Sequence, residues 1–231
     1  LAAQEQLKHW RTPDNQTLSI RIAIRAGEFT AMHVGGVLGR WEILLTGLPL
    51  IQVGIAEQVA NPGDVVLYET TWRFLQGNGS GQQLPSGHWR LDALGQKPPL
   101  QPLIESSLPT SAENALRAYI PGAVISRLAA GQTAWLAELR IVSVLFINLL
   151  DLDYKLPLNM AQQVMQTVQT ALYRYEGSLN KISIDDKGVA LVAALGLPPF
   201  AHEDDPIRAV LVAQEIRHNL QGLGLRPGIG I

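Results

Sequence analysis

The chain has 231 residues, of which 47% are apolar and 16% charged, so it can form a packed core and is not a disordered polymer. A formal net charge of −2 gives no electrostatic case for nucleic acid or an anionic membrane as partner, and the lack of cysteine excludes disulfides and thiolate metal sites. With no signal peptide and no apolar run near the roughly 20 residues of a membrane helix, we expect a cytoplasmic protein.

The first hundred residues alternate between short apolar runs and turn residues. Helical spacing over 1–10 precedes an alternating stretch at 18–24, which we expect to form a hairpin with 29–34 across Gly27 and Glu28. Further along, the pattern predicts strands at 41–46, 65–68 and 88–94, helices at 48–60 and 69–75, and a Gly- and Gln-rich loop at 77–87.

A proline-rich linker and two short helices come next, at 98–109, 110–120 and 121–130. The run at 140–149 is short, apolar and β-branched, as in a buried strand. After it we expect a helix at 158–175, a hairpin at 179–195 that turns at Gly188, and a helix that begins at Pro206. Strand, helix and hairpin in this order form the front half of a ferredoxin-like βαββαβ unit.

The strand and the hairpin also carry short motifs of a known family. The strand contains Phe146-Ile147-Asn148, and the hairpin contains Asn180-Lys181 ahead of Asp186-Lys187-Gly188. In order and spacing these motifs resemble the class III nucleotide cyclase catalytic domain, and most of all the second domain of tandem, soluble-type adenylate cyclases. The resemblance covers most of the chain. It implies an α+β fold of ferredoxin-like cyclase half-domains and an active site, between two domains, that converts ATP to 3′,5′-cyclic AMP and pyrophosphate.

A weak internal repeat suggests how the half-domains are arranged. Ala3-Gln4-Glu5 recurs as Ala213-Gln214-Glu215, each time in a helix followed by a turn and an apolar strand. We therefore expect a fragment with three parts: the C-terminal half of a first cyclase-like domain at 1–104, a helical linker at 105–138, and the N-terminal half of a second domain at 139–231. If the halves join as a circular permutant, the 141–148 strand should pair with strands of the first part.

The resemblance also implies a pair of metal-binding positions. Cyclases of this class hold two Mg²⁺ ions with two carboxylates of the sheet. Asn148 occupies the first of these positions and Asp185 the second, so one carboxylate of two remains. Asn148 is equally interpreted as a strand-end amide that satisfies backbone groups. This domain is therefore interpreted as the non-metal partner, with Mg²⁺ bound mainly by residues outside the fragment.

Lys181 matches the lysine with which the second domain binds the adenine ring. An ammonium group only donates hydrogen bonds, so it favours a purine with an acceptor at that edge. The alternative for Lys181 is a solvated surface lysine. Asp186 either orients Lys181 or solvates the hairpin turn, and the turn is the preferred interpretation.

The family's catalytic Asn and Arg are replaced by Ile51 and Ile55 in the 48–60 helix, so no catalytic residue is assigned in this chain. The leading hypothesis is a portion of an adenylate cyclase that binds ATP and pairs with another cyclase domain. The alternative is a degenerate cyclase-like regulatory module that binds nucleotide or a neighbouring domain, since such tandem domains are often followed by an ATPase and helical repeats.

Overall fold

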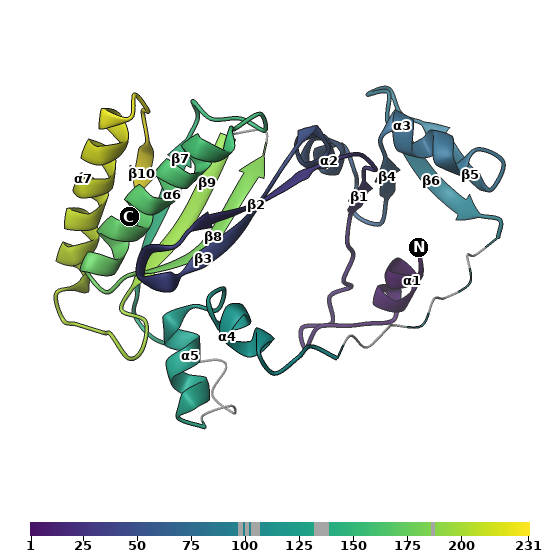
Figure 1. Ribbon diagram of the computed structural model, residues 1–231. Coiled ribbons are helices and arrows are strands. Elements are labelled where there is room, and N and C mark those ends of the chain that lie inside the picture. The colour runs from purple at the N-terminus through teal and green to yellow at the C-terminus, as the bar shows by residue number, and fades with distance from the viewer. Residues whose placement is uncertain (97–98, 100–101, 103–106, 132–138, 186–187) are drawn as a thin grey trace. The chain divides into compact units, whose positions relative to one another are not determined.

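A computed structural model describes residues 1–231 except 97–98, 100–101, 103–106, 132–138 and 186–187 (Figure 1). The chain forms two compact units, Leu1–Phe29 with Gly47–Glu105 and Thr30–Thr46 with Ser106–Ile231. Each combines helices with a mainly antiparallel sheet, so the expected α+β class is confirmed. None of the described helices is long and apolar enough to cross a membrane.

The first unit is built on a four-stranded sheet in the order β1-β4-β6-β5, in which only β1 and β4 run parallel. Its elements are α1 (Ala2–Lys8), β1 (Ile22–Ile24), α2 (Leu48–Gln58), β4 (Val65–Leu67), α3 (Glu69–Trp72), η2 (Arg73–Leu75), β5 (Gly79–Gln83) and β6 (Trp89–Leu94).

Residues of β4 supply both core clusters of this first unit. Val66 packs with Ala56 and Ala60 at the end of α2, while Val65 and Leu67 pack in a second cluster that includes Trp72. Consecutive strand residues face opposite sides of a sheet, so a fully apolar three-residue strand needs cover on both faces.

The Gly- and Gln-rich stretch at 77–87 was predicted as a loop, and this prediction is wrong because β5 lies within it. β5 is an edge strand that pairs with β6 through backbone groups, which need no apolar side chains. Gly81 also permits a close approach, since a Cβ atom there would lie 2.4 Å from the Arg90 carbonyl and 3.1 Å from the Trp72 ring.

The second unit has a four-stranded, fully antiparallel sheet in the order β10-β7-β9-β8, next to a separate two-stranded hairpin (Figure 1). Its elements are β2 (Thr30–Gly35), η1 (Val37–Gly39), β3 (Trp41–Thr46), α4 (Ala112–Arg117), α5 (Gly122–Ala129), β7 (Ser143–Leu149), α6 (Leu158–Arg174), β8 (Ser178–Asp185), β9 (Gly188–Leu195), α7 (Asp205–Gly222) and β10 (Gly228–Gly230).

One face of this sheet packs against α6 and α7, which Figure 1 shows lying across the strands. Side chains of alternate strand residues fill the layer between them, and Leu145, Ile147 and Leu191 are at most 1% exposed. The alternation predicts Ile147 and Ile182 in the core and Lys181 on the opposite face. Ile147 is buried and Lys181 exposed, as predicted, while Ile182 is only half-buried on edge strand β8.

The predicted hairpin between 18–24 and 29–34 is wrong. Residues 30–35 pair with 41–46, and β1 pairs with β4 in parallel. The turn of the actual hairpin begins at Gly35 and Gly36, whose φ angles of 108° and 91° lie in a region that favours glycine. Gly27 has no such φ angle, so a single glycine in the sequence was a misleading turn signal.

The strand pairing expected of a circular permutant is also absent from the described residues. β7 pairs with β9 on one side and β10 on the other, so it has no free edge for β2 or β3. The β2–β3 hairpin joins this unit through side chains instead, mainly those of α6.

Two glutamines of α6 bind the backbone of the hairpin turn. Gln162 accepts a hydrogen bond from the Gly35 amide at 2.9 Å and donates to its carbonyl at 2.8 Å. Two helical turns later, the fully buried Gln169 accepts from the Val37 amide at 3.3 Å and donates to the Arg40 carbonyl at 3.2 Å. The helix therefore satisfies turn groups that would otherwise be buried without partners.

We predict that Gln169→Leu lowers the free energy of unfolding by about 1–3 kcal/mol, because it leaves a buried amide and carbonyl of the turn without partners. Gln166→Leu, at an exposed position of the same helix, is the matched control and should change stability by less than about 0.5 kcal/mol. Urea denaturation of both variants measures the difference, and equal losses would contradict this role of Gln169.

Candidate functional site

The face of the four-stranded sheet opposite α6 and α7, here called the open face, carries the residues singled out in the sequence. Strand register places Asn148 of β7, Lys181 of β8 and Ser183 of β8 on this face, because they alternate with the buried residues of each strand. Two cross-strand rows define it: Phe146–Val192–Lys181 and Asn148–Ala190–Ser183.

A β-bulge at Asn180 brings Lys181 to the open face. Leu179 pairs with Ala193 toward the helices, and both side chains are buried. Lys181, two residues later, pairs with Val192, the next residue of β9, because Asn180 is an extra residue in β8. The side chain of Lys181 therefore lies on the face opposite to that of Leu179. Without the bulge, strand alternation would direct Lys181 toward the core. No signal in the sequence distinguishes this register from an unbroken strand.

Phe146 is the main apolar side chain on the open face, with 61% of its surface exposed. It lies in the same row as Lys181, separated by one strand, so their Cα atoms are about 10 Å apart. Val192 lies between them. An exposed aromatic ring and an ammonium group thus lie on the same face of the sheet, with the apolar side chain of Val192 between them. This arrangement suits a planar heterocycle.

Asn148 does not have the backbone hydrogen bonds that one interpretation of the sequence gave it. Its Oδ1 atom is buried and has no hydrogen-bond partner among the described residues, although the side chain as a whole is half-buried. A buried oxygen without a donor costs free energy, so this position is not explained as a satisfied strand-end amide.

The two positions that the resemblance compares with metal ligands, Asn148 and Asp185, lie on different strands of the sheet. Asp185 pairs with Gly188 at the end of the hairpin, two strands and two residue steps from Asn148, which puts their Cα atoms on the order of 12 Å apart. Ligand oxygens of one Mg²⁺ ion lie about 2.0–2.1 Å from the metal, and an amide is a weak substitute for a carboxylate. No cluster of three His, Asp or Glu side chains able to hold a metal occurs in the described ranges. Asp186 lies outside the described residues.

Ile51 and Ile55, which the resemblance compares with the family's catalytic Asn and Arg, lie on α2 of the first unit. Ile51 is half-buried there and Ile55 is 40% exposed. Both side chains are hydrocarbon, so neither can stabilise charge that develops on a phosphate.

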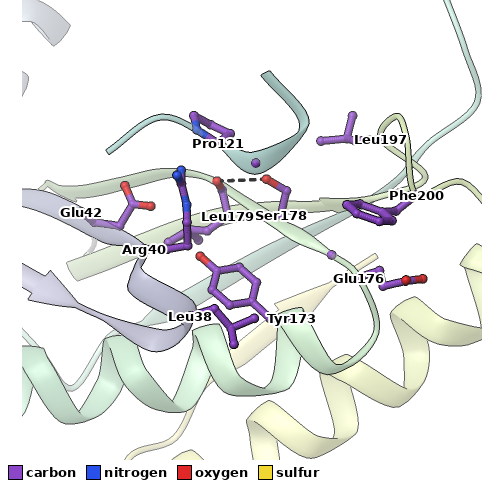
Figure 2. Close-up of a pocket in the computed structure, with 12 residues that line it drawn as sticks. Leu38, Arg40, Glu42, Pro121, Tyr173, Glu176, Ser178, Leu179, Leu197 and Phe200 are labelled. Carbon is purple, nitrogen blue, oxygen red and sulfur yellow. Dashed lines mark hydrogen bonds between the residues drawn. The ribbon is translucent and has the colours of Figure 1, made fainter. Parts of the chain in front are cut away.

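A second candidate site in the same unit consists of residues that the sequence did not single out. It is a cavity of about 310 Å³, and its polar lining includes Arg40, Glu42 and Tyr173 (Figure 2). Burial raises the pKa of the Glu42 carboxyl above its ordinary value, against the opposing charge of Arg40. Burial also raises the pKa of the Tyr173 hydroxyl, and the negative charge of Glu42 adds to this effect. These residues come from the β2–β3 hairpin and from α6, so their meeting depends on the hairpin docking described above.

Comparison with known proteins assigns no family to the chain. No model of a known protein family matches it, and no curated protein sequence matches it significantly. The functional interpretation therefore rests on the short motifs and on the arrangement of the open face.

We predict that Asn148→Leu raises the free energy of unfolding by about 1–2 kcal/mol, because leucine has a similar shape and removes the unpaired buried oxygen. Asn180→Leu, at an exposed bulge residue of the neighbouring hairpin, serves as the control and should not stabilise the protein. Chemical denaturation measures both. A loss of stability in Asn148→Leu would show that the amide has a partner in solution.

We predict that Glu42→Gln stabilises the protein near neutral pH and has little effect near pH 4. The raised pKa means that the unfolded chain releases this proton before the folded one does, so the wild type loses stability as the pH rises through the ordinary pKa of Glu toward the folded value. Glutamine does not titrate. The difference in Tm between variant and wild type should therefore grow from about pH 4 to about pH 7, and a constant difference would contradict the raised pKa.

Proposed function

We propose that the second unit contributes the adenine-binding face of a class III nucleotide cyclase, within a tandem, soluble-type adenylate cyclase. The reaction of the complete protein converts ATP to 3′,5′-cyclic AMP and pyrophosphate. The observation that carries the proposal is the position of Lys181, which follows Asn180 in the family's motif and is exposed on the open face in the same row as Phe146.

The topology of the second unit supports a ferredoxin-like cyclase domain. Its elements follow the order β7-α6-β8-β9-α7-β10, which is the βαββαβ sequence of that fold. In the sheet, the strand from the end of this sequence lies beside β7, and β9 lies between β7 and β8. This arrangement leaves one face of the sheet uncovered by the unit's own helices.

Lys181 gives the open face a preference among purines. Its ammonium group donates hydrogen bonds and accepts none, so it complements the unprotonated N1 of adenine rather than the N1–H of guanine. A base that lies over Val192 would have Lys181 at one edge and the Phe146 ring at the other. This pairing of a donor with an aromatic side chain favours ATP as the nucleotide.

We assign the Mg²⁺ ions and the catalytic Asn and Arg to residues outside this chain. Asn148 and Asp185 are too far apart for one ion, and Ile51 and Ile55 replace the catalytic pair. The open face would then complete an active site only against another cyclase domain. This role is consistent with a cytoplasmic protein in which an ATPase or helical repeats follow the cyclase domains.

The same residues favour a second candidate function. The single carboxylate on the metal-binding positions and the two isoleucines also fit a regulatory module that has lost catalysis and binds nucleotide or a neighbouring domain. The two candidates differ in the full-length protein, since only the first predicts cyclic AMP formation from ATP and Mg²⁺.

Nucleotide binding to the 231-residue chain tests whether Lys181 binds adenine. We predict that ATP shifts backbone amide NMR signals of Phe146, Lys181 and Val192 more strongly than GTP does. Lys181→Ala should weaken ATP binding at least about fivefold, because it removes a hydrogen bond to the base worth about 1 kcal/mol. Lys155→Ala, at an exposed lysine of the same unit, should leave binding unchanged.

We also predict that the purified chain forms no cyclic AMP from ATP and Mg²⁺. Cyclic AMP formation that Lys181→Ala abolishes would contradict the assignment of the catalytic groups to another domain. ATP-induced shifts confined to residues away from the open face would contradict the adenine-binding assignment.

A further inference from the structure

We propose that the cavity between β3, the C-terminal end of α6 and the start of α5 binds a small, uncharged ring compound with an amide or amino group. In this assignment the ligand's N–H donates to the Glu42 carboxylate, and its carbonyl oxygen or ring nitrogen faces Tyr173 and Arg40. The cavity is distinct from the open face. Its wall contains Leu179, which precedes the bulge in β8 and faces the helices, whereas Lys181 follows the bulge and lies on the open face.

The cavity has the size and enclosure of a small-molecule site. Its volume of about 310 Å³ lies at the lower end of the range for such sites. Figure 2 shows Pro121 opposite Tyr173 and Leu38, with Leu197 and Phe200 at one side. Four separate segments of the second unit therefore surround the space.

Large apolar side chains at the cavity are left partly in solvent. Leu38 is 80% exposed and Phe200 is 45% exposed, although both lie in its wall. Leu38 also has a φ of 51°, an uncommon conformation for a branched residue. A ring compound in the cavity would remove this apolar surface from water, which favours binding.

Three side chains form the polar edge of the cavity: Arg40, Glu42 and Tyr173. Arg40 is held in place by a 2.8 Å hydrogen bond from its guanidinium group to the Arg117 carbonyl. Figure 2 shows the Tyr173 hydroxyl directed toward Arg40. The half-buried Glu42 carboxylate has no hydrogen bond or ion pair to any residue in the described part of the chain. A ligand N–H would supply the missing partner, while Arg40 and Tyr173 are donors for an acceptor next to it.

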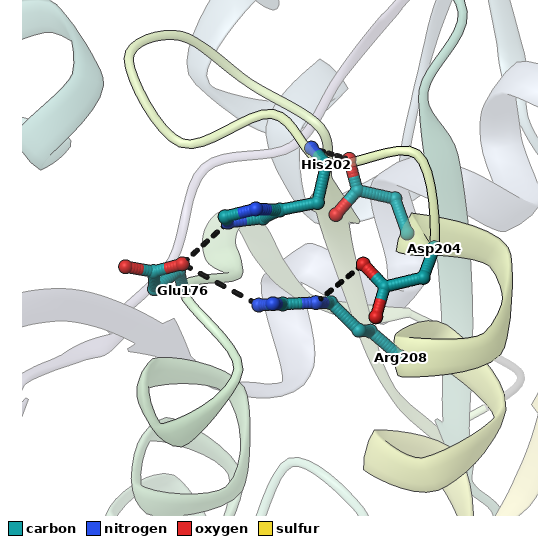
Figure 3. Close-up of polar contacts among 5 residues, drawn as sticks. Glu176, His202, Asp204 and Arg208 are labelled. Carbon is teal, nitrogen blue, oxygen red and sulfur yellow. Dashed lines mark hydrogen bonds and ion pairs between the residues drawn. The ribbon is translucent and has the colours of Figure 1, made fainter.

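The charges around the cavity disfavour anions. On the polar edge the single positive charge of Arg40 is matched by Glu42, so no excess positive charge is present there. Glu176, at the opposite side, is held by other groups: His202 lies 2.5 Å from its carboxylate and Arg208 lies 3.4 Å away, as Figure 3 shows. Arg208 also pairs with Asp204 at 2.9 Å. Among the residues that line this cavity, a phosphate or carboxylate would meet one cation, Arg40, and the two carboxylates of Glu42 and Glu176. The lining therefore carries an excess of negative charge, which disfavours nucleotides.

Three compounds of nearly equal shape test this selectivity by NMR titration of the 231-residue chain. Benzamide has both the donor and the acceptor, acetophenone lacks the donor, and benzoate lacks the donor and is negatively charged. We expect benzamide to shift the amide signals of Leu38, Arg40, Gly177 and Ser178 with a dissociation constant on the order of 1 mM. Acetophenone and benzoate should bind at least about tenfold more weakly, the cost of an unpaired buried carboxylate.

Two variants locate the binding. Gly122 lines the cavity, and a Cβ atom there would have no atom within 4 Å, so Gly122→Leu adds a bulky side chain at the cavity wall without a clash and should abolish the shifts. Gly54→Leu, at a helical glycine with equally open space in the other unit, is the control and should not affect them. Glu42→Gln should reduce the preference for benzamide over benzoate to less than about threefold, because glutamine can itself donate.

The proposal is overturned if benzamide causes no saturable shifts, if benzoate binds as tightly as benzamide, or if the shifts persist in Gly122→Leu. The ATP experiment on Lys181 is independent of all three outcomes, since that side chain lies on the open face.

Discussion

The second unit depends on the contact between α6 and the turn of the β2–β3 hairpin. Gln162 and Gln169 lie two helical turns apart on α6 and bind both amides and carbonyls of the turn. Gly35 makes this approach possible, because a Cβ atom at this residue would lie 2.7 Å from the Gln169 amide. Buried backbone groups must find partners, so these two side chains help to hold residues 30–46 against the C-terminal part of the chain, with which they form one compact unit.

Both candidate sites follow from this packing and from the alternation of the sheet. Once α6 and α7 cover one face, every second residue of β7 and β8 is left on the other face, and there Lys181 and Phe146 share a row. The docked hairpin then brings Arg40 and Glu42 over Tyr173 at the end of α6. The open face and the cavity therefore lie on different sides of β8, and the bulge at Asn180 separates them. The two proposed ligands, a nucleotide and an uncharged ring compound, would therefore bind at separate places.

Much of the local structure could be predicted from the sequence, but pairing between strands could not. The helices at 48–58 and 158–174 and the strands β7, β8 and β9 lie close to their predicted bounds, because apolar spacing there is regular and long. The hairpin at 18–34 was wrong, because strands in the region are short and Gly27 was taken for a turn. Pairing depends on which strand edges remain free after the helices pack, and that information is not local.

The sequence alone determined which residues are compared with the cyclase motifs: a lysine in a family-like motif, an asparagine where the family has a metal-binding carboxylate, and two isoleucines where it has its catalytic pair. These are properties of single side chains, so one-dimensional order is enough to find them. Only the tertiary structure decided that a bulge precedes Lys181, that the Asn148 oxygen has no partner among the described residues, and that Arg40, Glu42 and Tyr173 line one cavity. Each of these depends on contacts between segments far apart in the chain, where a single bulge residue or two glutamines of α6 set the geometry.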